Sequence, residues 1–223
     1  MAAIGKLYDK EIKCPVCNIK FETKKVRGSK LRLIKRDEDF LPYYEGENPI
    51  KYNVLVCPNC GYAATESKYD SLTKMEKEIV LTEISSKWNK RSYGGLRTLD
   101  DGIEAYKLAL YIGQLLDYNK LDLGLLCLNL GWSYRMKEDK EEEIRFLELA
   151  KELLENSFYN EYLNDTNMDE LRLSYLIGEL NRRLGNIKEA LKWFNTTISN
   201  PRLKSNPMLE NMVREQWRLT REG

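Results

Sequence analysis

The chain has 223 residues, of which 42% are hydrophobic and 32% charged, so it can form one large domain or two smaller ones with a core. Its 36 Lys and Arg residues nearly balance 35 Asp and Glu residues, and the net charge of +1 favours no class of partner. Histidine is absent. This excludes serine–histidine hydrolysis, papain-like cysteine chemistry and histidine-ligated catalytic zinc, so we expect a protein that is not an enzyme.

The N-terminal residues, MAAIGKLYDKEIKCPVC, lack the apolar core of a signal peptide. The most apolar stretch, LDLGLLCLNLGW, is shorter than the roughly 20 residues that a membrane helix needs. We therefore expect a cytoplasmic protein with no membrane contact.

Two cysteine pairs of equal spacing are the strongest chemical signal: Cys14-Pro-Val-Cys17 and Cys57-Pro-Asn-Cys60. Two such turns supply the four thiolates that zinc prefers in tetrahedral geometry. The residue after each second cysteine, Asn18 or Gly61, tolerates the left-handed backbone that such a turn needs. We predict one structural Zn²⁺ per chain.

The sequence also allows other roles for these cysteine pairs. A disulfide framework requires an oxidising compartment, and four thiolates can also bind an iron–sulfur cluster. A thioredoxin-like redox pair needs one Cys-x-x-Cys motif in a βαβ setting. The fifth cysteine, Cys127, has no partner at a similar spacing and is predicted to be a buried apolar residue.

Alternating apolar and charged residues predict strands at residues 21–26 and 30–36, with a third at 50–56. The intervening RGSK is predicted to be a turn, and residues 37–49 a long loop. These features are typical of a zinc ribbon, with the cysteine pairs at one end of a small antiparallel sheet. We predict a zinc-ribbon domain over residues 1–68.

The predicted ribbon is locally basic, with eight Lys and Arg residues and one acid between residues 20 and 36. A basic sheet with nearby aromatic residues is one kind of surface that binds single-stranded nucleic acid. A solvated strand face is the alternative interpretation. The candidate contacts are Lys24, Lys25, Arg27, Lys30 and Arg32.

From about residue 71 onward, apolar residues recur every three or four positions and prolines vanish until Pro201. Seven helices are predicted, at residues 71–91, 102–117, 121–137, 140–158, 168–184, 186–200 and 206–222. The fold class is therefore α+β but mostly α, with a small N-terminal β zinc ribbon followed by a tetratricopeptide-like α-solenoid. We assign residues 69–223 to this helical domain.

The helices show a degenerate repeat when Gly131 is aligned with Gly178. Small residues at the helix crossing, followed by Ala190 and Phe194, fit the tetratricopeptide pattern, although the interval of 47 residues exceeds the usual 34 or so. An irregular helical bundle is the alternative. On this alignment the groove-facing positions with partner-binding potential are Trp132, Arg135, Arg172, Tyr175 and Arg182.

Several segments together resemble an uncharacterised bacterial family, domain of unknown function 2225: CPVCNIKFETKKVRGSKLRL, NPIKYNVLVCPNCGYA, LGWSYR and LSYLIGELNRRLGNIKEALKWF. The resemblance spans nearly the whole chain. It implies a ribbon followed by tetratricopeptide-like helices, with zinc ligands at Cys14, Cys17, Cys57 and Cys60. It implies no catalytic site.

Three functions follow as hypotheses. The first is a cytoplasmic scaffold or adaptor that binds a peptide or protein, with acidic character favoured, on the helical-repeat surface. The second is a nucleic-acid-associated factor that contacts RNA or DNA through the basic ribbon. The third is an enzyme or a zinc–thiolate redox sensor.

Overall fold

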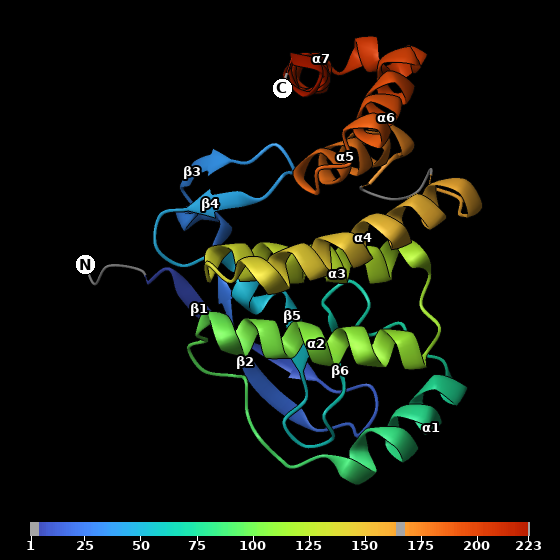
Figure 1. The fold of residues 1–223 in the computed structure, drawn as a ribbon. Helices are drawn as coiled ribbons and strands as arrows, with labels where there is room; N and C mark the ends of the chain where they lie inside the picture. Colours follow the sequence, from blue (N-terminus) through green and yellow to red (C-terminus); the bar gives the residue numbers. More distant parts are fainter. Residues whose placement is uncertain (1–4, 164–167, 223) are drawn as a thin grey trace. The chain divides into compact units, whose positions relative to one another are not determined.

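The computed structural model describes residues 5–163 and 168–222. They form short β hairpins followed by seven helices, which confirms a mostly α chain with a small N-terminal β part (Figure 1). The strands are β1 (Leu7–Lys13), β2 (Lys20–Val26), β3 (Leu33–Arg36), β4 (Pro42–Tyr44), β5 (Val54–Val56) and β6 (Ala63–Thr65). The helices are α1 (Lys74–Glu83), α2 (Leu99–Leu115), α3 (Lys120–Met136), α4 (Lys140–Asn160), α5 (Glu170–Arg183), α6 (Ile187–Ser199) and α7 (Pro207–Glu222).

The chain divides into two compact units, which differ from the predicted domains 1–68 and 69–223. Unit 1 comprises residues 1–35, 42–118 and 132–139, and unit 2 comprises residues 36–41, 119–131 and 140–223. Helices α1 and α2 belong with the hairpins, because α2 packs against β5 and β6. Independent folding of residues 1–68 stays a prediction. Within residues 5–163 and 168–222, no helix is both long and apolar enough to cross a membrane.

The hairpins do not form the single small sheet expected of the ribbon. They are three separate two-stranded sheets, β1–β2, β3–β4 and β5–β6. The first runs from the pair Leu7↔Val26 to the pair Lys13↔Lys20. An isolated two-stranded hairpin is marginally stable in water, so these hairpins depend on what packs against them. Strands β1, β4 and β6 lie in segments for which the sequence predicts no strand.

Helix α1 is shorter than the helix predicted over residues 71–91. It begins after Thr73, whose hydroxyl accepts the Glu76 N–H in a capping box, and it ends at Glu83. The hydroxyls of Ser85 and Ser86 donate to backbone carbonyls of the last turn, at 3.2 and 2.5 Å. Serine side chains that bond to the backbone compete with helix continuation. A 3₁₀ turn, Ser85–Lys87, follows instead.

Unit 1 is organised around a buried cation, Arg97, which is 4% exposed. Its guanidinium donates to the carbonyls of Tyr93 (2.8 Å), Lys51 (3.0 Å) and Val54 (2.8 Å), and to the Thr23 hydroxyl at 3.4 Å. Burial lowers the pKa of Arg97. A buried charge is costly unless it is hydrogen-bonded, and these acceptors meet that need while joining β2, β5 and the segment before α2.

Unit 2 has an apolar core between α5, α6 and α7, which follow one another in the orange-to-red part of Figure 1. The cluster, called here the helical core, comprises Leu171, Tyr175, Ala190, Phe194, Leu203, Leu209 and Val213. Phe40 packs against this core from the 36–41 segment. The core is built by the helical spacing that the sequence predicts.

The predicted repeat is visible in the packing of α3 on α4 and of α5 on α6. A methyl group added at Gly131 would meet Leu147 at 2.7 Å, and one added at Gly178 would meet Phe194 at 2.7 Å. Leu147 and Phe194 both lie sixteen positions after their glycine. The same small-to-large contact therefore recurs at the interval of 47 residues.

The turns inside the two pairs also match. Glu138 and Gly185 both have left-handed backbones, with φ of 64° and 79°. In each turn the following N–H donates to a carbonyl five residues earlier, at 3.0 Å for Asp139 and 2.8 Å for Asn186. This is the hydrogen bond of a Schellman-type helix end, which favours glycine at the left-handed position.

Candidate metal centre

The two cysteine turns have the same backbone geometry. The N–H of Asn18 donates to the Cys14 carbonyl at 2.9 Å, and the N–H of Gly61 donates to the Cys57 carbonyl at 3.0 Å. Asn18 has φ of 61° and Gly61 has φ of 74°, as the sequence predicts. In each turn the N–H of the first cysteine also donates to the carbonyl five residues later, at 2.9 and 2.8 Å.

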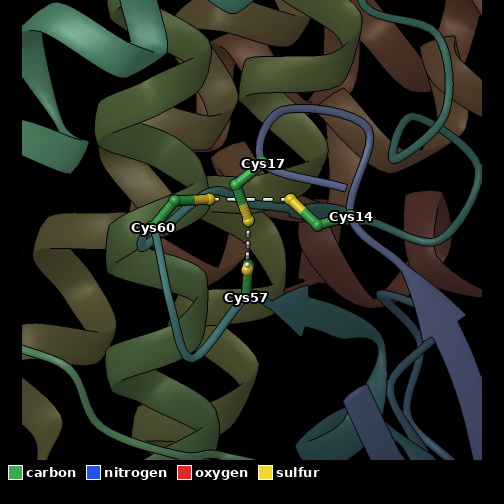
Figure 2. Close-up of side chains that lie close together, drawn as sticks. All are labelled: Cys14, Cys17, Cys57 and Cys60. Carbon is green, nitrogen blue, oxygen red and sulfur yellow. Dashed lines mark hydrogen bonds between the residues drawn. The ribbon is translucent and has the colours of Figure 1, made fainter. Parts of the chain in front are cut away.

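Figure 2 shows the four side chains pointing at a common centre from the two turns. The four Sγ atoms all lie within 4.8 Å of one another. Cys14 and Cys60 sulfurs are 3.5 Å apart, and Cys17 and Cys57 sulfurs are 3.6 Å apart. A tetrahedral zinc with Zn–S distances of about 2.3 Å separates its sulfurs by roughly 3.8 Å, so the cluster is of the size that encloses one ion.

These distances also decide among the alternatives. A disulfide needs sulfurs about 2.05 Å apart, and all five cysteines are free. A multi-iron cluster attaches thiolates to different irons and spreads the sulfurs further than a single ion does. A single thiolate-binding metal ion fits these distances, and zinc is one ion that takes four such ligands in a closed site.

Hydrogen bonds within the cluster shift the pKa values of Cys14, Cys57 and Cys60 in different directions. Hydrogen bonds from Cys57 and Cys60 hold the pKa of Cys14 well below its usual value, and the N–H groups of Cys17 and Val16 act in the same direction. The interaction with Cys14 raises the pKa of Cys57 and of Cys60. Thiols bind zinc as thiolates, so metal binding would release the remaining protons.

Aromatic side chains of unit 1 close the site. The indole of Trp88 donates to the Pro58 carbonyl at 3.0 Å, and a methyl group added at Gly61 would meet its ring at 2.5 Å. Tyr69 is buried, and its pKa is raised by burial and by the charge on Cys14. Cys14, Cys57 and Cys60 are at most 3% exposed. With four protein ligands and little solvent access, the site suits a structural ion.

Cys127 is not one of the clustered cysteines. It is 1% exposed, and burial raises its pKa to about 12. A buried, protonated thiol is chemically inert, so Cys127 is the small apolar core residue that the sequence predicts.

The basic residues proposed for nucleic-acid contact are mostly engaged within unit 1. Lys24 pairs with Asp9 at 2.7 Å and Lys25 with Glu66 at 2.6 Å. The Arg27 guanidinium lies over the Tyr8 ring, 5.0 Å from its centroid. Lys30 and Arg32 are exposed, and Arg32 lies 3.8 Å from Glu45. The acids Asp9 in β1 and Glu66 just after β6, which the local count between residues 20 and 36 omits, therefore neutralise part of this charge.

The residues proposed for partner binding have different environments. Trp132 and Arg135 are half-buried on α3 in unit 1, and Arg172 is exposed on α5 in unit 2. Tyr175 is fully buried in the helical core, so it is not an exposed anchor in this structure. Arg182 is half-buried and grips Glu179 with two hydrogen bonds of 2.7 and 2.8 Å.

Three residues that sequence reasoning missed are important in the structure: Trp88, Arg97 and Phe40. Trp88 was predicted to continue a helix, and the serine pair before it is the signal that could have ended that helix. No sequence pattern indicates that Arg97 is buried, because its carbonyl acceptors at Lys51 and Val54 lie in distant segments of the chain. Phe40 was assigned to a loop, although an aromatic residue among acids is unusual for a solvated loop.

The chain is similar to bacterial proteins of one family. Residues 7–220 match the family described as "Uncharacterized protein conserved in bacteria (DUF2225)". The chain belongs to this family. An "Uncharacterized protein" from Borreliella burgdorferi is 27% identical over 169 residues, which cover 68% of this chain and 61% of that relative. No solved structure matches the chain.

Proposed function

We propose that this family member is a zinc-stabilised protein-interaction module of the cytoplasm, without catalytic activity. The metal would hold the hairpins of unit 1, and helical repeats would bind a peptide or protein of acidic character. Four cysteine ligands complete a tetrahedral site and leave no position for a substrate, which supports a structural rather than a catalytic ion.

The repeated helix pair is the observation that carries this proposal. The contacts Gly131–Leu147 and Gly178–Phe194 recur at one interval, and the two turns share one geometry. Helical repeats of this kind bury their core between neighbouring helices and leave one face for a ligand.

The ligand face that we propose lies on α5, where three arginines occur within twelve residues. Arg172 is exposed, and Arg182 and Arg183 are half-buried beside Glu179. Guanidinium groups recognise carboxylates with paired hydrogen bonds, which suits an acidic ligand. On α3, Arg135 corresponds to Arg182 and Trp132 to Glu179 in the repeat, and both are proposed as contacts by the same argument.

Charge reversal at an exposed arginine tests the proposal. Tagged wild-type protein and the Arg172→Glu variant would be used to capture partners from native cells, with and without nuclease. We expect a specific protein partner that survives nuclease and is lost with Arg172→Glu, while Arg214→Glu on α7 retains it. Loss of every partner after nuclease would instead favour a nucleic-acid role for Lys30 and Arg32.

A further inference from the structure

The segment Asp37–Leu41, called here the acidic turn, has an unusual conformation. The Phe40 N–H donates to the Asp37 carbonyl at 2.9 Å, and the Asp37 N–H donates to the Leu41 carbonyl at 2.9 Å. Phe40 has φ of 73°, which a bulky side chain rarely adopts and which such turns usually assign to glycine. The turn itself does not favour phenylalanine at this position, so the contribution of Phe40 lies in the packing of its ring.

The acidic turn is bound to α5 by three kinds of contact. The Phe40 ring lies 5.3 Å from the Tyr175 ring and packs on the helical core. The Tyr175 hydroxyl donates to the Glu38 carbonyl at 3.0 Å. Arg183 donates to the Glu38 carboxylate at 3.0 Å and lies 3.6 Å from the carboxylate of Asp39, which is fully buried.

The receiving face is organised around the fully buried Glu179. Arg182 holds both oxygens of this carboxylate, and Arg183 donates to it at 2.7 Å. Two guanidiniums around one carboxylate leave a net positive charge and orient Arg183. A pre-oriented guanidinium on the same helix as an aromatic ring is well suited to recognise a short acidic peptide.

Asp39 and Leu41 of the bound turn are fully buried, whereas the other three residues of the turn are not. The turn is strained at Phe40, and Glu38 is exposed. The strand that leads into it, β3, is exposed along its whole length. The strain at Phe40 costs free energy while the turn occupies α5, and the receiving face does not share that cost.

We propose that the α5 face is a recognition site for an acidic turn followed by an aromatic residue, and that the chain's own acidic turn occupies it. A partner protein that carries an acidic–aromatic turn displaces the internal one and binds through Tyr175 and Arg183. This inference rests on the proposed function, since it names the class of partner and the part of the helical surface that binds it.

The test uses a labelled synthetic peptide with the sequence of residues 33–44 and full-length, zinc-loaded protein. Phe40→Gly removes the internal ring and suits the left-handed turn, so the chain keeps its hairpin while the ring position on α5 is vacated and the rest of the turn is held less tightly. We expect this variant to bind the peptide at least ten-fold more tightly than wild type, measured by fluorescence anisotropy. Adding Arg183→Gln should abolish the gain, and Arg214→Gln should preserve it.

A peptide whose phenylalanine is replaced by glycine should not bind. If Phe40→Gly fails to fold by circular dichroism, Glu38→Gln removes only an exposed carboxylate, and a tightening of about three-fold is expected. A folded vacated variant that ignores the peptide, or that binds it regardless of Arg183, would overturn the inference. Dimerisation of that variant without peptide binding would show an exchange between copies and would equally overturn it.

The two proposals fail separately. Peptide binding at α5 without any protein partner in cells would contradict the interaction function but leave the recognition chemistry intact. A partner lost with Arg172→Glu but unaffected by the peptide would place the partner elsewhere on the helical surface.

Discussion

Each compact unit buries a charge, and the two charges are neutralised differently. In unit 1 the guanidinium of Arg97 is bound by backbone carbonyls and a hydroxyl from segments up to 74 residues away. In unit 2 the carboxylate of Glu179 is bound by Arg182 and Arg183, three and four residues along the same helix. The first arrangement ties together distant pieces of chain, whereas the second is almost complete within one helical turn.

The difference extends to what stabilises each unit. Unit 1 contains two-stranded hairpins and a four-cysteine cluster, so its hairpins depend on polar and metal-ligand contacts. Unit 2 has continuous helices and a seven-residue apolar core. Unit 1 should therefore be sensitive to loss of a single ligand or donor, and unit 2 to changes in packing.

The largest expected effect comes from the metal ligands. Cys57→Ser should reduce bound zinc from about one per chain to none and disorder the hairpins, because structural zinc contributes on the order of 10 kcal/mol to such folds. Helical circular dichroism from unit 2 should persist. The control is Cys127→Ala, which should keep its zinc by elemental analysis. Retained zinc in Cys57→Ser, or iron in the wild-type protein, would refute the assignment.

The buried cation of unit 1 should have the next largest effect. Arg97→Met leaves three backbone carbonyls without their donor, and each unsatisfied buried group costs about 1–3 kcal/mol. We expect the free energy of unfolding to fall by about 3 kcal/mol or more in chemical denaturation. Arg91→Met is the matched control, because Arg91 is exposed and pairs with Glu104 on the surface. An equal loss in both variants would mean that burial of Arg97 is not decisive.

Packing in unit 2 can be tested at the repeated glycine. Gly178→Ala places a methyl group 2.7 Å from the Phe194 ring, and overpacking of this kind costs about 1–3 kcal/mol. The double variant Gly178→Ala with Phe194→Leu should recover part of the loss, because it leaves room for the methyl group. Additive losses in this cycle, measured by denaturation, would show that the two positions are not coupled.

The smallest effect should be a gain. Glu138 is exposed and left-handed where its repeat equivalent is Gly185. Glu138→Gly should raise the free energy of unfolding by roughly 0.5–1 kcal/mol, and Gly185→Ala should lower it by about 1 kcal/mol. Thermal denaturation of the two variants measures the expected gain in stability for Glu138→Gly and the expected loss for Gly185→Ala. Equal effects of the same sign would show that the two turns are not equivalent.

Sequence patterns predicted those parts of the structure that are determined by residues close together in the chain. Cys-x-x-Cys spacing with Asn18 or Gly61 behind it specifies a turn within five residues, and the structure contains that turn twice. In helices α2 to α7, apolar residues recur every three to four positions, and this pattern is visible in the sequence. The weak repeat between Gly131 and Gly178 was also visible, since both glycines face a large residue at the same offset.

The basic ribbon and the α5 face show where local sequence patterns were insufficient. Lys24 and Lys25 were predicted to contact nucleic acid, but they form ion pairs with Asp9 in β1 and with Glu66, the residue after β6. Tyr175 and Arg183 receive the acidic turn from Glu38 and Phe40, up to 145 residues away. The sequence by itself determined the two cysteine turns, the helices and their repeat, because each arises from neighbours along the chain. Tertiary structure alone decided which charges are neutralised and which faces are covered, because burial and ion pairing depend on segments that meet only after folding.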